Sequence, residues 1–172
     1  MRGLIVTAAW LVCLVGGPPA TAQTTSYAQV GNWAITRSDG NQCWMATGTS
    51  TSVFALTLDN RGRYGVAFSV IREAAVPAQI LFGISAMDVP FSKDKDGMRK
   101  AFTKVFTRGT EHFYQARLTA AEMAVLRRRR IISFTEMLTG AGGYSNISAA
   151  HVVDYDSAAE QVWRRCVAEL GS

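Results

Sequence analysis

The cysteines are the residues of this chain whose chemistry is easiest to assign. Cys13 lies in an apolar first segment, and only Cys43 and Cys166 remain beyond it. They are far apart in sequence, no Cys-x-x-Cys motif is present, and the other potential ligands lack the spacing of a metal site. An even pair of cysteines in an exported chain favours a disulfide. Closing so long a loop stabilises the fold by about 4–5 kcal/mol in the chain-entropy model.

A run of four arginines is the most concentrated charge in the sequence: Arg127, Arg128, Arg129 and Arg130. Guanidinium groups bind phosphate, sulfate and carboxylate groups through paired hydrogen bonds, so the run is a possible anion-binding site. The alternative is a solvated helix end, where cations interact favourably with the helix dipole. Because no aromatic residues are interleaved with the arginines to stack on bases, we expect no nucleic-acid partner.

The remaining titratable residues do not form a catalytic pattern. His112 and His151 lie in apolar stretches typical of packed side chains, and nucleophile-elbow, metalloprotease and phosphate-loop motifs are absent. Several aspartates lie in turn segments instead of in a recognisable pair: Asp39, Asp59, Asp94 and Asp96. We therefore expect no cofactor and no bound metal, and the chain is more typical of a non-enzymatic protein than of an enzyme.

The first 22 residues have the organisation of a cleavable signal peptide. Arg2 is their only charged residue, residues 4–15 are apolar, and residues 20–22 form the Ala-x-Ala pattern of a cleavage site. The apolar run of about a dozen residues is shorter than the roughly 20 that a membrane span needs. Cleavage would leave a chain that begins at Gln23, has no transmembrane segment and has a net charge of +4, since the +5 of the full sequence includes Arg2. The predicted location is the periplasm or outside the cell.

Beyond a leader at residues 23–29, which we expect to be flexible, alternating apolar residues predict short strands separated by turns. The expected strands are 33–36, 42–46, 54–58, 64–70, 80–84, 102–107, 112–116, 131–137 and 147–153. Residues 98–106 fit either a helix or a strand, and their β-branched and aromatic residues favour a hairpin with 112–116. The expected helices are 119–128 and 157–170. This content is typical of one antiparallel, β-rich α+β domain, residues 30–172, with a short internal helix and a C-terminal helix.

Both expected helices begin with a capping-box pattern. Thr119 precedes Glu122 by three residues, and Ser157 precedes Glu160 by the same spacing. In the second helix, apolar residues recur at helical spacing on one face. Cys166 lies on that face and Glu160 mainly on the opposite one. The predicted disulfide would therefore tie the C-terminal helix to the sheet.

Trp44 is a possible docking point for a partner. It follows Cys43 on a strand, so the two side chains point to opposite faces, and Trp44 would lie away from the C-terminal helix. On that face the other strands carry small residues: Ala55, Thr57, Gly65, Ala67, Ser69, Gly83 and Ser85. A face with one large aromatic residue could bind a partner, or the second half of the sheet could cover it, and we favour the second interpretation.

Short motifs span most of the sequence beyond the signal peptide: Val-Gly-Asn-Trp at residues 30–33, Cys-Trp at 43–44 and Trp-Arg-Arg-Cys at 163–166. Together with the signal peptide, they resemble a group of uncharacterised secreted proteins of Gram-negative bacteria and, more distantly, the invasion-associated locus B family. The resemblance implies a periplasmic β-rich domain without known catalytic residues, and a bridge between Cys43 and Cys166. The chain departs from the family pattern because it lacks a second, central pair of cysteines.

Two functions from different classes remain. The leading one is a non-enzymatic periplasmic binding or envelope-associated module, with an envelope protein or an anionic polymer as partner, because the positive net charge favours acidic partners. The alternative is a hydrolase that acts on envelope polymers through carboxylates. A hydrolase needs a cleft with a buried, paired carboxylate, whereas a binding module needs an exposed aromatic or cationic surface without one.

Overall fold

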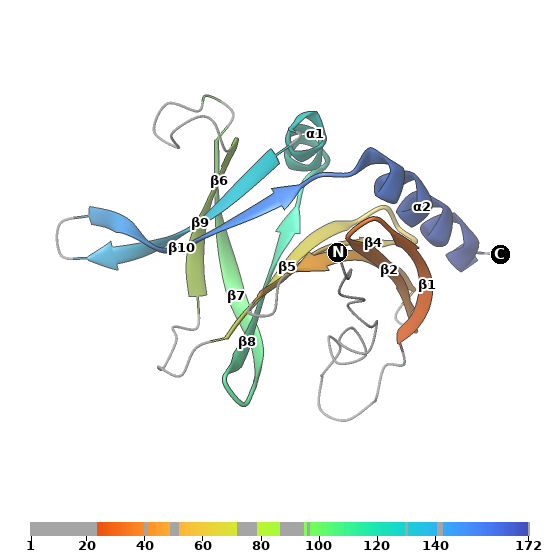
Figure 1. The fold of residues 1–172 in the computed structure, drawn as a ribbon, viewed down its shortest axis with the longest axis horizontal. Helices are drawn as coiled ribbons and strands as arrows, with labels where there is room; N and C mark the ends of the chain where they lie inside the picture. The colour runs from red at the N-terminus through yellow and green to blue at the C-terminus, as the bar shows by residue number, and fades with distance from the viewer. Residues whose placement is uncertain are drawn as a thin grey trace, which may run out of the picture.

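The computed structural model describes residues 24–39, 41–48, 52–71, 79–86, 95, 97–129, 131–140 and 143–171. Within these residues, ten strands form one antiparallel sheet in the order β1-β2-β3-β4-β5-β8-β7-β6-β9-β10. The sheet is strongly curved, and both helices lie on its upper side in the view of Figure 1. The predicted β-rich α+β class, with a short internal helix and a C-terminal helix, is confirmed.

The first five strands lie side by side in chain order: β1 (Thr24–Val30), β2 (Trp33–Ser38), β3 (Gln42–Gly48), β4 (Ser52–Asp59) and β5 (Tyr64–Ile71). Two of their turns, after β2 and after β4, contain a residue with a left-handed backbone, Asn41 with φ 56° and Gly62 with φ 76°, and the turn after β1 contains a third, Gly31 with φ 54°. Asp59 stabilises the turn after β4, because its Oδ1 accepts hydrogen bonds from the backbone N–H groups of Arg61 and Arg63 at 3.0 and 2.9 Å. The turns after β2 and β4 lie where the sequence predicts them.

The second half of the sheet departs from chain order: β5 pairs with β8 (Glu111–Leu118), followed by β7 (Met98–Arg108), β6 (Gln79–Ala86), β9 (Ile131–Gly140) and β10 (Gly143–Asp154). β7 and β8 form the hairpin favoured for this region, with Gly109 in its turn at φ 59°. The strand interpretation of residues 98–106 is therefore confirmed.

The segment at residues 23–29 is not the loose leader that we expected. Residues 24–30 form β1, which pairs with β2 with one irregularity between Ser26 and Ala28. The Tyr27 hydroxyl donates a hydrogen bond to Glu169 Oε1 at 2.8 Å, and Tyr27, Ala28 and Val30 pack against the core. Its Ser/Thr/Gln composition is typical of a loop, but backbone pairing with β2 and these apolar contacts make it an edge strand.

The internal helix, α1 (Ala120–Arg128), has the predicted capping box. The Glu122 backbone N–H donates to Thr119 Oγ1 at 3.1 Å, and the Thr119 N–H donates to Glu122 Oε2 at 2.7 Å. Two apolar side chains of the helix, Met123 and Leu126, are fully buried in the core.

The C-terminal helix, α2 (Ser157–Ala168), continues into a 3₁₀ turn at Glu169–Gly171. Its N-cap is Asp156, whose Oδ1 accepts from the N–H groups of Ala158 and Ala159 at 2.7 and 3.2 Å. The predicted capping box of Ser157 with Glu160 is therefore wrong. Aspartate is as good an N-cap as serine, and its negative charge also interacts favourably with the positive end of the helix dipole. Glu160 is also buried, with 8% of its surface exposed, and not on a solvated face.

The predicted disulfide between Cys43 and Cys166 is confirmed, and it joins β3 to α2 with 6.2 Å between the two Cα atoms. Trp163 supports the same junction, because its Nε1 donates a hydrogen bond to the backbone oxygen of Cys43 at 2.9 Å. All three side chains are fully buried in the main core.

Among the described residues, no helix has both the length and the apolar character to cross a membrane.

Candidate functional site

The face of the sheet turned away from α2 carries a groove of about 430 Å³. The register of β3, β4, β5 and β8 places Trp44 beside Thr57, Thr57 beside Gly65, and Gly65 beside Arg117. One row of groove residues therefore runs from a large aromatic side chain on β3 to a cationic side chain on β8, with small residues between them.

A second row lies two residues further along each strand. It runs through Ala46, Ala55, Ala67, Gln115 and Thr103, each opposite the next. The three alanines make this part of the face low and apolar, whereas Gln115 and Thr103 add hydrogen-bonding groups at its far side. Of this row, Ala67, Gln115 and Thr103 line the groove, so its floor combines a small apolar side chain with polar groups on β7 and β8.

Trp44 is the large buried side chain of the groove. Only 9% of its surface is exposed, and it packs with Ala46 and Ala55 in a cluster separate from the main core. Its indole Nε1 has no hydrogen-bond partner, and no other buried side-chain nitrogen or oxygen among the described residues shares this condition. The side chain of Trp44 is thus largely covered while its N–H donor is unused.

The other two tryptophans of the sheet and helix show what a buried indole normally does. Trp33 Nε1 donates to the backbone oxygen of Asp154 at 3.1 Å, and Trp163 Nε1 donates to that of Cys43 at 2.9 Å. An unsatisfied buried donor costs about 1–3 kcal/mol. Because the Nε1 atom itself is buried, a ligand acceptor reaches it only when the indole shifts, and such a contact would then recover this free energy.

The rim of the groove carries two arginines in different states. Arg63 Nε lies 2.6 Å from Asp59 Oδ2. Burial raises the pKa of Asp59, but hydrogen bonds from the backbone and side chain of Arg63 outweigh it, so the pKa lies below its usual value of 3.8. The side chain of Arg117, in contrast, is exposed and forms no ion pair or hydrogen bond within the described part of the chain.

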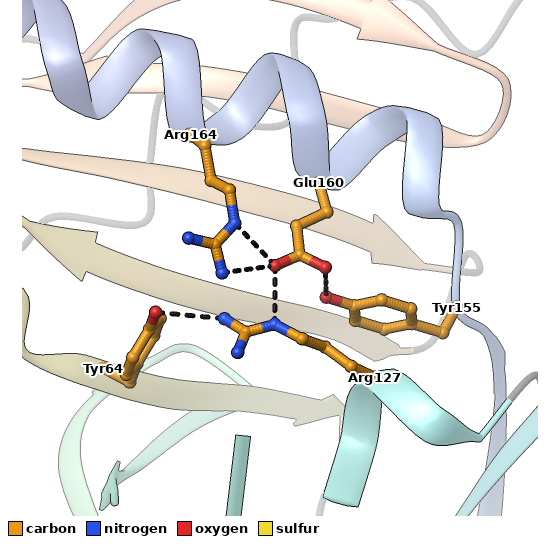
Figure 2. A network of polar contacts seen from close by, with 5 residues as sticks. All are labelled: Tyr64, Arg127, Tyr155, Glu160 and Arg164. Carbon is orange, nitrogen blue, oxygen red and sulfur yellow. Dashed lines mark hydrogen bonds and ion pairs between the residues drawn. The ribbon is translucent and has the colours of Figure 1, made fainter. Parts of the chain in front are cut away.

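A separate polar network lies between the two helices and β5 (Figure 2). Glu160 Oε1 accepts from Arg127 Nε at 2.6 Å and from Arg164 Nε at 2.8 Å, and its Oε2 accepts from the Tyr155 hydroxyl at 2.6 Å. Arg127 also donates to the Tyr64 hydroxyl at 3.0 Å and lies 5.3 Å from the centre of that ring. The network ties the end of α1 to the first turn of α2.

The charge states of this network are those of a structural ion pair. Burial raises the pKa of Glu160, but hydrogen bonds from Tyr155, Arg164 and Arg127 outweigh it and hold the pKa below 4.5. Burial and the hydrogen bond to Glu160 raise the pKa of Tyr155 far above its usual value of 10.0. At neutral pH the carboxyl group is therefore charged and the phenol is neutral.

The four arginines of the run do not share one environment. Arg127 is held in the network, Arg128 is exposed, and Arg129 is the C-cap of α1, with its N–H donating to Leu126 O at 3.1 Å. Arg130 lies outside the described residues. Arg127 already has a carboxylate partner, and anion binding by the run stays a prediction.

The remaining sequence candidates do not come together. His112 is buried, with its Nδ1 at 3.1 Å from Thr107 Oγ1. The side chain of His151 and the residues Asp94 and Asp96 lie outside the described part of the chain. Within that part, no group of three or more histidine, cysteine and acidic residues is placed to hold a metal ion.

Sequence reasoning located the Trp44 face but missed its polar side. Strand alternation identifies which residues of β3, β4 and β5 share a face, but the pairing of β5 with β8 brings in Arg117 from a distant segment. It also missed the network, because Arg127 and Glu160 are 33 residues apart and no spacing rule joins them.

These features define a fold class: a curved antiparallel sheet joined to a C-terminal helix by a disulfide. No family model and no curated protein sequence matches the chain. Among solved structures, it is similar to the crystal structure of invasion associated protein B from Bartonella henselae, with 12% identity, a TM-score of 0.57, and coverage of 88% of this chain and 100% of that one. At this identity the similarity shows the fold alone, and at that level it confirms the resemblance inferred from the sequence motifs.

Proposed function

We propose that this chain is a non-enzymatic binding module that works in the periplasm or outside the cell, and that it binds its ligand in the groove beside Trp44. The unpartnered Nε1 of Trp44 carries the proposal. A buried N–H without an acceptor is unfavourable in the free protein, so an acceptor supplied by a ligand, reached through a shift of the buried indole, would add to the affinity.

The disulfide supports a location outside the cytoplasm. Disulfides persist in oxidising compartments and are rare where thiols are kept reduced, and Cys43 and Cys166 are bonded. The predicted signal peptide at residues 1–22 fits the same location.

The states of two carboxyl groups favour binding over hydrolysis. A general acid at neutral pH needs a pKa raised toward 7, whereas arginine neighbours lower the pKa values of both Asp59 in the groove and Glu160 in the network. Each of these carboxylates is also engaged by two or more hydrogen bonds that hold turns or helices in place. They stabilise the fold instead of being free to act on a substrate.

The experiment that tests the proposal uses the protein purified from the periplasm and isolated envelopes of a Gram-negative bacterium, labelled in their polysaccharide. We expect saturable retention of the protein on the envelopes, without release of soluble labelled fragments. Trp44→Phe should weaken retention, whereas Arg165→Gln, on the exposed side of α2, should leave it unchanged.

Two results would contradict the proposal. Steady release of labelled fragments that stops in Asp59→Asn would identify a hydrolase. Equal retention of the wild type and Trp44→Phe, with both folded by circular dichroism, would remove the groove from the function.

A further inference from the structure

We infer that the ligand of the groove is an acidic saccharide. Its carboxylate binds Arg117 at one end of the groove, and its ring hydroxyl or ether oxygens bind Trp44 at the other end. This inference rests on the proposed function and names the ligand class of the same site.

The length of the groove fits an extended ligand and not a small ion. Three strand-to-strand steps separate Trp44 from Arg117, and neighbouring strands lie about 4.8 Å apart, which gives about 14 Å between the two ends. The volume of about 430 Å³ lies within the range of sites for small organic molecules. A short oligosaccharide spans both ends, whereas an inorganic anion reaches only one.

The lining of the groove fits a ligand that is rich in hydroxyl groups. Gln42, Thr57, Thr103 and Gln115 line it, and their amide and hydroxyl groups both donate and accept hydrogen bonds. Within the described residues none of these side chains forms a hydrogen bond. Sugar hydroxyls also both donate and accept, so they can pair with every one of these groups.

Glycine at position 65 keeps the middle of the groove low. A Cβ on Gly65 would lie 2.5 Å from Thr57 Oγ1, so any other residue would collide with the threonine of the next strand. With Ala67 and Ala101, Gly65 forms a stretch of floor without large side chains. Such a floor can pack against the C–H face of a sugar ring, and it offers no deep apolar pocket for a peptide side chain.

The strands of the groove exclude recognition by strand addition. A peptide that adds to a sheet needs an unpaired strand edge, but β3, β4, β5, β8 and β7 each pair with a neighbour on both sides. The ligand must therefore be recognised by side chains, and the side chains present are those just described.

The charge of the ligand follows from Arg117. Arg63 is already paired with Asp59, so it adds no free positive charge to the groove. Arg117 has no such partner within the described residues and is exposed at the end of the row. A guanidinium binds a carboxylate through two parallel hydrogen bonds, which favours an acidic sugar over a neutral one.

The test measures by calorimetry the affinity of the periplasmic protein for four probes. They are an oligomer of galacturonic acid, the same oligomer with its carboxyl groups reduced to alcohols, hexaglutamate and inorganic phosphate. We expect the acidic oligosaccharide to bind at least about tenfold more tightly than its reduced form. Hexaglutamate and phosphate should bind more weakly still.

Two groove variants and one control make the assignment specific. Arg117→Gln should lower the affinity for the acidic oligosaccharide to that of the reduced one, and leave the affinity for the reduced one unchanged. Trp44→Phe should weaken both by a similar factor, because the Trp44 donor faces a neutral acceptor. Arg165→Gln makes the same charge change on α2 and should alter neither. Arg117→Lys, which keeps the charge but loses the paired geometry, should give an intermediate affinity.

Each other outcome overturns the inference. Equal affinity for the acidic and reduced oligosaccharides would identify a neutral glycan, and tighter, Arg117-dependent binding of hexaglutamate would identify an acidic peptide. If no probe binds but envelope retention still depends on Trp44, the ligand class is wrong while the proposed function stands. If envelope retention itself is independent of Trp44, the proposed function fails with it.

Discussion

The three tryptophans of the described chain make the same donor available in three different settings. Trp33 and Trp163 each donate to a backbone oxygen of a distant segment, and both are almost completely buried. Trp44 is buried to nearly the same degree without a partner. Burial alone therefore does not distinguish Trp44 from the other two tryptophans, whereas the state of its indole N–H does.

Replacing these tryptophans by phenylalanine should separate the two roles. Trp163→Phe removes a satisfied hydrogen bond and leaves the Cys43 oxygen unpaired, whereas Trp44→Phe removes a donor that has no partner. We expect Trp163→Phe to lower the free energy of unfolding by about 1–3 kcal/mol more than Trp44→Phe does. Urea unfolding of both variants at pH 7 measures the difference, and equal losses would mean that the Trp44 donor is satisfied.

Glu160 should make the stability depend on pH in the acid range. Its pKa lies below 4.5 in the folded protein, so the carboxylate binds a proton more weakly there than in the unfolded chain. Its contribution to stability is therefore complete above pH 4.5 and is lost as the pH falls through the lower, folded-state pKa. Glu160→Gln should flatten the acid part of the curve and cost about 1–3 kcal/mol at pH 7. Unfolding midpoints between pH 3 and 7 test this, and an unchanged acid slope would contradict it.

At the scale of elements, most local patterns were predicted correctly, whereas among the long-range contacts the disulfide was predicted and the ion-pair network was not. The capping box of Thr119 with Glu122 and the hairpin of β7 with β8 depend on residues close in sequence, and both form as expected. The edge strand β1 was missed because its composition is typical of a loop. The Asp156 cap was missed because Ser157 and Glu160 also have the spacing of a capping box. Glu160 was placed wrongly because its partners come from α1 and from the segment before α2.

The disulfide should decide how firmly α2 is held to the sheet. Cys43 and Cys166 close a loop with a sequence separation of 123, and without the bond the helix depends on its buried face and the Trp163 hydrogen bond. We expect Cys43→Ser to lower the free energy of unfolding by about 2–5 kcal/mol. Hydrogen exchange should then detect α2 as the first protected segment to open. Reduced wild-type protein is the control and should behave alike, whereas a β-strand that opens before α2 would contradict the prediction.

At the scale of the whole molecule, the first five strands could be ordered from the sequence because each follows its neighbour. The order of the second half could not, because β5 pairs with β8, and β6 lies between β7 and β9. Those pairings join segments that are far apart in the chain, and they also build the groove. The residues that share the Trp44 face could thus be identified from the sequence, which favoured coverage of that face, whereas the Arg117 end of the groove required the sheet.

Cleavage of the signal peptide and formation of the disulfide should occur together when the chain is exported. If residues 1–22 are a signal peptide, the exported protein should begin at Gln23 and should carry no free thiol, since Cys13 leaves with the signal. The same protein made without residues 1–22 in a reducing cytoplasm should instead keep Cys43 and Cys166 as thiols. N-terminal mass analysis and thiol labelling after denaturation measure both properties on the same samples. Replacing Ala20 and Ala22 by leucine should block cleavage and leave a longer chain. A wild-type periplasmic product that retains Met1, or that carries a lipid on Cys13, would contradict the prediction.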